Sequence, residues 1–168
     1  MYNIIIKNQS MAIHYPYLPK NWQILYVPED NPFMLAAREK ALKESKDKSV
    51  QTGSVMVKDG VIIGTGANGS DFHNNNECVR VKLKIPTGQG YELCEGCHPK
   101  NHSEPKAIKD AQDHGFDTQG ADLYLWGHWW CCEPCWNAMI EAGIKNVYLL
   151  EDSEFLFSKS DPRNILPK

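Results

Sequence analysis

The residues best suited to chemistry in this chain are a histidine and a glutamate in the triplet His102-Ser103-Glu104, and two cysteines, Cys132 and Cys135, that follow about thirty positions later. One histidine and two cysteines offer three ligands to a tetrahedral metal ion and leave its fourth corner open, as catalytic zinc requires. A carboxylate beside water activated by such an ion can accept a proton and pass it on. The set predicts a hydrolytic zinc centre with Glu104 as the catalytic residue and His102, Cys132 and Cys135 as zinc ligands.

Each motif alone is weak evidence. A single Cys-x-x-Cys pair is also typical of redox proteins, and a single His-x-Glu pair carries little information. Here each motif opens a predicted helix, and the two helices precede and follow one predicted strand, which would bring both N-termini to the same end of a sheet. Cys132 and Cys135 would share a helix face, where unpaired backbone N–H groups favour thiolate. The combination favours metal catalysis.

The elements that position these residues follow from periodicity and turn signals. Asn31-Pro32 before apolar residues at helical spacing predicts a helix ending near Ser45, and an Asp-Gly pair between apolar runs 53–57 and 61–64 predicts a hairpin. Further patterns predict a helix from about 103 to 115, a strand over 121–126, a helix from 132 to 143 and a strand over 147–150. This alternation predicts an α/β fold with helices packed on a mixed sheet.

Two regions are harder to interpret. The tail from residue 153 onward is ambiguous, because Phe155-Leu156-Phe157 is compatible with one more short strand, whereas Pro162 and Pro167 favour an irregular end. The polar segment 69–101 shows no periodic pattern, and a loop of that length is uncommon in a compact domain unless it is functional or held in place.

The segment 69–101 contains the motif Cys94-Glu95-Gly96-Cys97-His98, which has the spacing of a metal knuckle. We expect a second, structural zinc in this insertion, and the fourth ligand is left open by the sequence. The alternative is a set of reduced, uncoordinated thiols. The candidate ligands are His73, Cys78, Cys94, Cys97 and His98.

The bulk properties agree with a single domain spanning 1–168. The chain is 42% hydrophobic and 23% charged, as in ordinary globular proteins, and the run Ile4-Ile5-Ile6 is too short for a signal-peptide core or a membrane span. We therefore expect a cytoplasmic protein without a membrane partner, whose six cysteines favour metal ligation over disulfides. The net charge of -3 provides no basic field to attract a polyanion.

From its first predicted helix through Leu150, the chain resembles the cytidine deaminase superfamily, and more closely its deoxycytidylate deaminase branch. The resemblance implies a three-layer α/β/α fold with a mixed central sheet.

The family usually has alanine where this chain has Ser103, and proline where it has Cys131. Its register implies that Cys132 and Cys135 form the ligand pair, because a reading from Cys135 would need a second cysteine at Ala138. The resemblance rests on Thr52-Gly53-Ser54-Val55-Met56-Val57, the turn Gly66-Ala67-Asn68-Gly69, the triplet 102–104, and Cys135-Trp136-Asn137-Ala138-Met139-Ile140.

The resemblance also implies a reaction, the hydrolytic deamination of a pyrimidine at C4, in which Glu104 moves protons to the ring and to the leaving ammonia. It implies that Asn68 contacts the sugar, that the main-chain N–H of Ser103 contacts the base, and that Gly53 lies at the substrate site. A left-handed turn residue is the alternative interpretation of Asn68. Homo-oligomers are common in the family.

The expected substrate is a free cytosine nucleotide, with deoxycytidylate converted to deoxyuridylate. An alternative is a base in nucleic acid, either adenosine in tRNA or cytidine in a polynucleotide, because Trp129 matches a tryptophan of the polynucleotide cytidine deaminases and can stack on a base. A second alternative is an inactive, zinc-stabilised binding module, which the intact Glu104 disfavours. Arg80, Lys82 and Lys84 either face a phosphate or form a solvated strand face.

Overall fold

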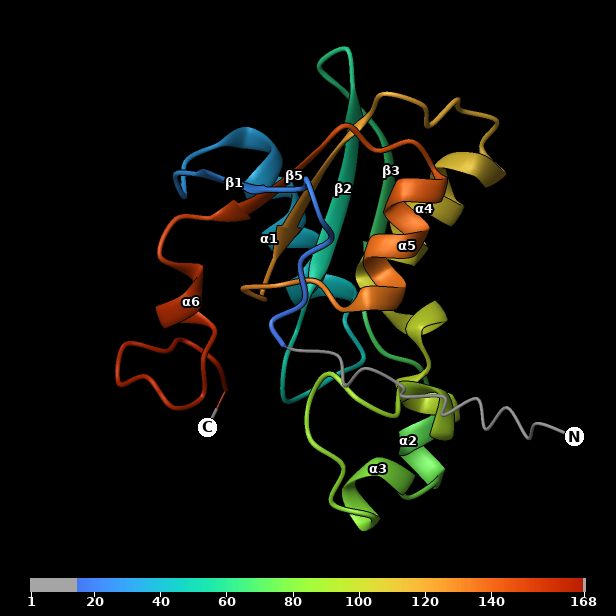
Figure 1. The fold of residues 1–168 in the computed structure, drawn as a ribbon, viewed down its shortest axis with the longest axis vertical. Coiled ribbons are helices and arrows are strands. Elements are labelled where there is room, and N and C mark those ends of the chain that lie inside the picture. The colour runs from blue at the N-terminus through green and yellow to red at the C-terminus, as the bar shows by residue number, and fades with distance from the viewer. Residues whose placement is uncertain (1–14, 168) are drawn as a thin grey trace, which may run out of the picture.

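Five strands form one mixed sheet in the computed structural model, which describes residues 15–167 (Figure 1). The strand order is β1-β5-β4-β2-β3, in which β1, β5 and β4 run parallel and β2 is antiparallel to both β4 and β3. The run Ile4-Ile5-Ile6 lies outside the described residues. The strands are β1 (Ile24–Val27), β2 (Gly53–Lys58), β3 (Val61–Ala67), β4 (Asp122–Trp126) and β5 (Asn146–Leu150).

Helices cover both faces of this sheet. Helix α1 (Pro32–Glu44) packs on one face, and helices α4 (Ser103–Asp113) and α5 (Glu133–Glu141) lie beside each other on the opposite face (Figure 1). The predicted three-layer α/β/α fold with a mixed sheet is therefore confirmed. Within residues 15–167, no helix combines the length and the apolar character needed to cross a membrane.

Helix α1 begins where its sequence provides a cap. The side-chain oxygen of Asn31 accepts hydrogen bonds from the backbone N–H groups of Phe33 and Met34 at 3.0 and 3.1 Å. The helix then approaches β2 so closely that a Cβ atom on Gly53 would lie 2.1 Å from the carbonyl oxygen of Ala37. Gly53 is thus explained by the packing of α1 on the sheet.

Helix α4 makes an equally close approach on the other face. A Cβ atom on Gly64 would lie 2.3 Å from the carbonyl oxygen of Ala107, and one on Gly66 would lie 2.2 Å from that of Ser103. Ala107 and Ala111, which point at the sheet, are completely buried. The two glycines of β3 therefore determine how closely the first turn of α4 lies against the sheet.

The sheet differs from the sequence prediction in two places. Strand β1 was not predicted, although Ile24-Leu25-Tyr26-Val27 is an apolar run with β propensity, and it pairs with β5. The predicted turn at Gly66-Ala67-Asn68-Gly69 was partly wrong, because Gly66 and Ala67 continue β3. Gly66 allows α4 to pack closely on β3. In the sequence alone, a glycine needed for such packing cannot be distinguished from a glycine in a turn.

The tail forms a short helix, α6 (Ser153–Leu156), so the interpretation of Phe155-Leu156-Phe157 as a strand was wrong. Asp152 has a left-handed backbone with φ of 58° and turns the chain away from the sheet. Strand β5, which precedes the tail, already pairs with β1. Phe157 instead packs edge-on against Trp126, with ring centroids 5.0 Å apart.

The insertion between β3 and α4 contains regular structure, contrary to the sequence prediction. Its elements are too short to produce a visible periodicity, and α2 and α3 lie beyond one end of the sheet (Figure 1). Arg80 and Lys82 belong to a helical turn, so their interpretation as one face of a strand was wrong. The elements are α2 (Phe72–Asn75), α3 (Val79–Lys82) and the 3₁₀ helices η1 (Tyr91–Leu93), η2 (Glu95–Cys97) and η3 (Pro99–Asn101).

The close contact of β3 with α4 predicts that Gly66→Ala destabilises the protein. The added methyl group would overlap the backbone of α4, so we expect the free energy of unfolding to fall by roughly 1–3 kcal/mol in denaturant titrations. Val61→Ala is the matched control, because Val61 is 60% exposed on the same strand and its truncation should change stability by less than about 0.5 kcal/mol. Equal stabilities of Gly66→Ala and wild type would contradict this role of Gly66.

Candidate active site

The three predicted ligands meet where two helices begin. His102 is the N-cap residue of α4, Cys132 is the N-cap residue of α5, and Cys135 lies in the first turn of α5. The Nδ1 atom of His102 lies 3.3 Å from the sulfur of Cys135 and 3.5 Å from that of Cys132, and the two sulfurs are 3.3 Å apart. The helix starts predicted from the sequence therefore bring these side chains together.

The spacing and chemistry of these atoms fit zinc. Tetrahedral ligands at ordinary zinc distances would place nitrogen and sulfur roughly 3.5 Å apart and two sulfurs roughly 3.8 Å apart. The nitrogen–sulfur distances of 3.3 and 3.5 Å lie close to the first value. One nitrogen and two sulfurs are preferred zinc ligands, and three protein ligands leave one position for a reactant.

The local electrostatics favour ionisation of one of the two cysteines. Hydrogen bonds from Cys135 and His102 outweigh burial and lower the pKa of Cys132 to about 6, whereas burial raises the pKa of Cys135. Burial opposes the charged form of His102, but the neighbouring Cys132 raises the pKa of this imidazole overall. Cys132 is therefore the cysteine that ionises more readily, and zinc binds cysteine as thiolate.

Glu104 lies in the first turn of α4, is 5% exposed, and lines the same cavity as His102 and Cys132. Cys131, the neighbour of Cys132, is buried outside the ligand cluster. Burial and the nearby charge of Glu104 raise the pKa of the Cys131 thiol, so this cysteine stays neutral. Its position agrees with the expectation of a packed core residue.

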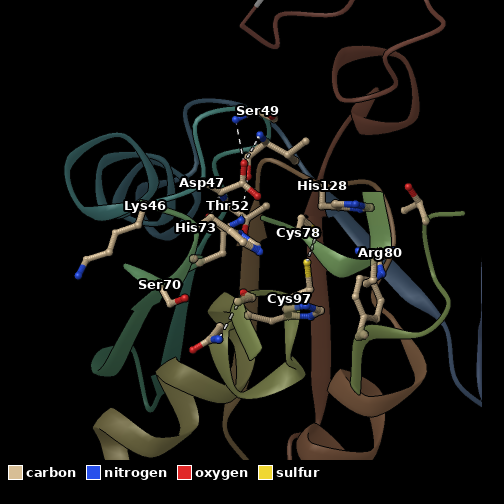
Figure 2. A pocket seen from close by; sticks show the side chains of 18 of the residues that line it. Lys46, Asp47, Ser49, Thr52, Ser70, His73, Cys78, Arg80, Cys97 and His128 are labelled. Carbon is tan, nitrogen blue, oxygen red and sulfur yellow. Dashed lines mark hydrogen bonds between the residues drawn. The ribbon is translucent and has the colours of Figure 1, made fainter. Parts of the chain in front are cut away.

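A cavity of about 540 Å³ opens over this cluster, within the usual range for small-molecule sites. Its walls come from the segment after α1, the end of β3, the insertion and the segment before α5 (Figure 2). Trp130, which precedes Cys131, is among the residues that line it. The basic residues of the lining are Lys46, Lys48, Arg80 and Lys159.

The insertion reaches the candidate metal centre through Tyr91. The ring of Tyr91 meets the His102 imidazole edge-on, with centroids 4.9 Å apart, and burial raises the pKa of Tyr91 to about 12, so its hydroxyl stays neutral. The Arg80 guanidinium stacks over Tyr91 at 4.2 Å and donates hydrogen bonds to the carbonyl oxygens of Gln89 and Pro86. Arg80 therefore holds the insertion together, and Tyr91 was missed because no motif marks it.

Asn68 lines the cavity, but its side chain is engaged with the protein. Its Oδ1 atom accepts hydrogen bonds from the Ser45 hydroxyl at 2.5 Å and the Thr52 backbone N–H at 2.9 Å, and its Nδ2 atom donates to the Val50 carbonyl at 2.8 Å. Its backbone is not left-handed, so the alternative interpretation as a left-handed turn residue was wrong. In this structure Asn68 ties the end of β3 to the segment that follows α1.

The other three candidate substrate residues lie away from the cavity lining. Gly53 faces α1, and Ser103 is completely buried behind Glu104. Trp129 packs partly buried against both hydrophobic cores, and the cavity is lined by its neighbour Trp130 instead. Residue types alone could not distinguish these adjacent tryptophans.

A second group of potential metal ligands lies within the insertion. The donor atoms of His73, Cys78, Cys94 and Cys97 all lie within 4.8 Å of one another, whereas His98 lies outside this group and accepts a hydrogen bond from the backbone N–H of Lys100. Figure 2 shows His73, Cys78 and Cys97 at the wall of the cavity. The insertion thus joins four of the five candidates proposed from the sequence.

His128, which the sequence interpretation also missed, lines the cavity as a neutral imidazole. Its Nδ1 atom accepts hydrogen bonds from the backbone N–H groups of Trp129 and Trp130 at 3.1 and 3.3 Å. Because Nδ1 is an acceptor, the proton of the neutral ring is on Nε2. Burial lowers the pKa of His128 to about 4.

This pKa predicts a pH-dependent loss of stability. Between about pH 6.5 and pH 4, the unfolded chain binds a proton at His128 that the folded chain does not, so acidification favours unfolding by at most about 1.4 kcal/mol per pH unit. His128→Asn keeps an acceptor for the two N–H groups but does not titrate, and should therefore reduce the slope of unfolding free energy against pH. Equal slopes for wild type and His128→Asn would contradict this assignment.

Comparison with known proteins places this site in a family. The sequence profile described as "Cytidine and deoxycytidylate deaminase zinc-binding region" matches residues 28–151, which include both helix N-termini and the insertion. The curated relative "ComE operon protein 2" of Bacillus subtilis (strain 168) is 29% identical over 126 residues, which are 73% of this chain and 59% of that protein. The chain thus spans about three fifths of the length of this relative.

Two solved structures are among those that the structural comparison matched. A dCMP deaminase from the cyanophage S-TIM5 in its apo form is 20% identical, with 74% of this chain and 86% of that chain covered and a TM-score of 0.45. A diaminohydroxyphosphoribosylaminopyrimidine deaminase and reductase from Thermotoga maritima is 28% identical, with 70% and 28% covered and a TM-score of 0.44. Given the profile match over most of its length, the chain belongs to the cytidine and deoxycytidylate deaminase zinc-binding family.

Proposed function

We propose that this protein is a zinc-dependent hydrolytic deaminase of a free cytosine nucleotide, and that it converts deoxycytidylate to deoxyuridylate. The observation that carries this proposal is the buried carboxylate of Glu104, which shares a 540 Å³ cavity with the metal ligands His102 and Cys132. A purely structural metal site has no use for such a carboxylate. A binding module without catalysis is therefore the weaker alternative.

The chemistry divides between the metal and the side chains of this chain. His102, Cys132 and Cys135 would hold the zinc, which when bound would supply a Lewis acid for the activation of water beside C4 of the base. Glu104 accepts a proton from that water and donates it to N3 of the ring. Once the water oxygen is bonded to C4, Glu104 takes its remaining proton and passes it to the amino group, which leaves C4 as ammonia while the C4–oxygen bond becomes a carbonyl.

The charges around the cavity support a small phosphorylated substrate. Lys48 and Lys159 line the cavity, are exposed, and make no ion pair with the residues that the structure describes. Lys46 also lines it but is paired with Asp71 at 2.5 Å. Two available ammonium groups suit one phosphate, whereas a net charge of -3 for the whole chain is unfavourable for a long polyanion.

Deamination of a base in tRNA or single-stranded DNA has less support. Its local argument was Trp129, which lies outside the cavity lining, although Trp130 offers an aromatic face there. A cytoplasmic location and a homo-oligomeric state remain predictions from the sequence.

Ammonia release by the zinc-loaded protein tests the proposal. Deoxycytidylate should give the highest kcat/KM in a panel that also contains cytidylate, deoxycytidine, deoxycytidine triphosphate, single-stranded DNA and tRNA. Activity on the polymers alone would reject the proposed substrate.

Glu104→Gln should lower kcat on every accepted substrate by at least roughly 100- to 10,000-fold, because the amide cannot accept the proton. Glu133→Gln is the matched control, since Glu133 occupies the first turn of α5 but does not line the cavity. Near wild-type turnover by Glu104→Gln would reject the catalytic assignment.

The proposal includes a second, structural zinc held by His73, Cys78, Cys94 and Cys97. The Nε2 atom of His73 lies 3.2 Å from the Cys94 sulfur, and the Cys78 and Cys97 sulfurs are 3.5 Å apart, near the spacing of tetrahedral zinc ligands. A Cβ atom on Gly96 would lie 2.5 Å from the His73 ring, so this glycine leaves the space that the imidazole occupies.

The electrostatics of this cluster favour ionisation of Cys94, whereas burial raises the pKa of Cys97 to about 12. Burial opposes ionisation of Cys94, but hydrogen bonds from His73 and from backbone N–H groups lower its pKa to about 6. Four ligands close the coordination sphere, as in structural zinc sites. Bound there, the zinc would hold together the insertion that carries Tyr91.

Elemental analysis should find two zinc equivalents per chain. His73→Ala should retain one, because the second site would lose a ligand, and its insertion should be cleaved faster by protease. His98→Ala is the matched control and should retain two, since His98 lies outside the cluster. One equivalent in the wild type, or equal zinc contents in the two variants, would contradict the proposed ligand set.

A further inference from the structure

Two serine hydroxyls lie in a row behind Glu104. Ser54 comes from β2 and Ser103 from α4, and both residues are completely buried. Their Oγ atoms are 2.8 Å apart, and the Oγ atom of Ser103 lies 3.1 Å from Oε2 of Glu104. Neither serine lines the cavity, and their hydroxyls are connected to it through Glu104.

The direction of this hydrogen-bond chain follows from counting hydrogens. An ionised carboxylate can only accept, so the Ser103 hydroxyl must donate its single hydrogen to Glu104. Ser103 therefore accepts from Ser54, which donates the hydrogen of its own hydroxyl. The chain runs from Ser54 through Ser103 to Oε2 of Glu104.

We infer that Ser54 and Ser103 are positioning residues that hold Oε2 of Glu104 and leave its Oε1 atom to transfer protons at the reaction centre. This inference rests on the proposed function of Glu104. A glutamate side chain has several rotatable bonds, and a buried hydrogen bond to a charged oxygen restricts them strongly. Proton transfer demands an accurate placement of the base, so an unrestrained carboxylate would be less effective.

The Ser103 hydroxyl contacts both Glu104 and Ser54, and all three residues are buried. The two serines therefore act as one unit.

Steady-state kinetics of zinc-loaded variants test the inference. Ser103→Ala should lower kcat about tenfold, with KM within about twofold of wild type and an unchanged zinc content, as expected when a hydrogen bond that orients a reactive group is lost. The double variant Ser54→Ala/Ser103→Ala should show the same kcat as Ser103→Ala, because Ser54 acts only through Ser103.

Ser153→Ala is the matched control. Ser153 is 1% exposed, and its hydroxyl has no hydrogen-bond partner among the described residues, so its removal should leave kcat unchanged. A lowered unfolding temperature of Ser103→Ala with unchanged kcat would show a merely structural role and overturn the inference.

Crystal structures of the zinc-loaded wild type and Ser103→Ala provide a readout that does not depend on a substrate. Glu104 should have one orientation in the wild type, with Oε2 on Ser103, and a changed or divided orientation in the variant. An identical Glu104 orientation in both would overturn the inference, whatever the kinetics. Absence of wild-type activity on every nucleotide would instead reject the proposed substrate, while the Glu104 orientation would still decide the role of the serines.

Discussion

The close packing of α4 on the hairpin β2–β3 is the constraint on which the candidate active site depends. Gly64 and Gly66 leave no Cβ atoms between the strand and the backbone of α4, and Ala107 and Ala111 complete the contact with small side chains. This contact sets the position of the first turn of α4 relative to the sheet. His102 and Glu104 project from that turn, and the same contact brings Ser103 against Ser54.

The candidate metal centre is a product of two helix N-termini that meet. His102 and Cys132 are both N-cap residues with extended backbones, and the Nδ1 atom of His102 lies 3.5 Å from the sulfur of Cys132. The partial positive charge of a helix N-terminus favours a thiolate near Cys132 and a carboxylate at Glu104. One geometric feature thus supplies the ligands, the base and part of their electrostatic stabilisation.

The insertion connects two sites that are separate in the sequence. Its Cys/His cluster lies within a segment composed of very short helices, and this segment forms a wall of the cavity and places Tyr91 against His102. Metal binding in the insertion would therefore affect the shape of the substrate site without contact with the reacting atoms. Arg80 also stabilises this wall of the cavity, because its guanidinium donates hydrogen bonds to the carbonyl oxygens of Gln89 and Pro86 within the insertion.

The sequence by itself determined the reactive residues, the two helix starts that carry them, and the α/β class, because metal ligands, caps and hydrophobic periodicity are local signals. It could not determine the presence of β1, the length of β3 or the secondary structure of the tail. These features depend on which strands pair, and strand pairing joins residues that are far apart in the sequence. Only the tertiary structure distinguished His73 from His98, placed Trp130 rather than Trp129 at the cavity, and joined Ser54 to Glu104 through Ser103. These outcomes depend on the direction in which a side chain points after distant segments have packed, and spacing along the chain carries no record of that direction.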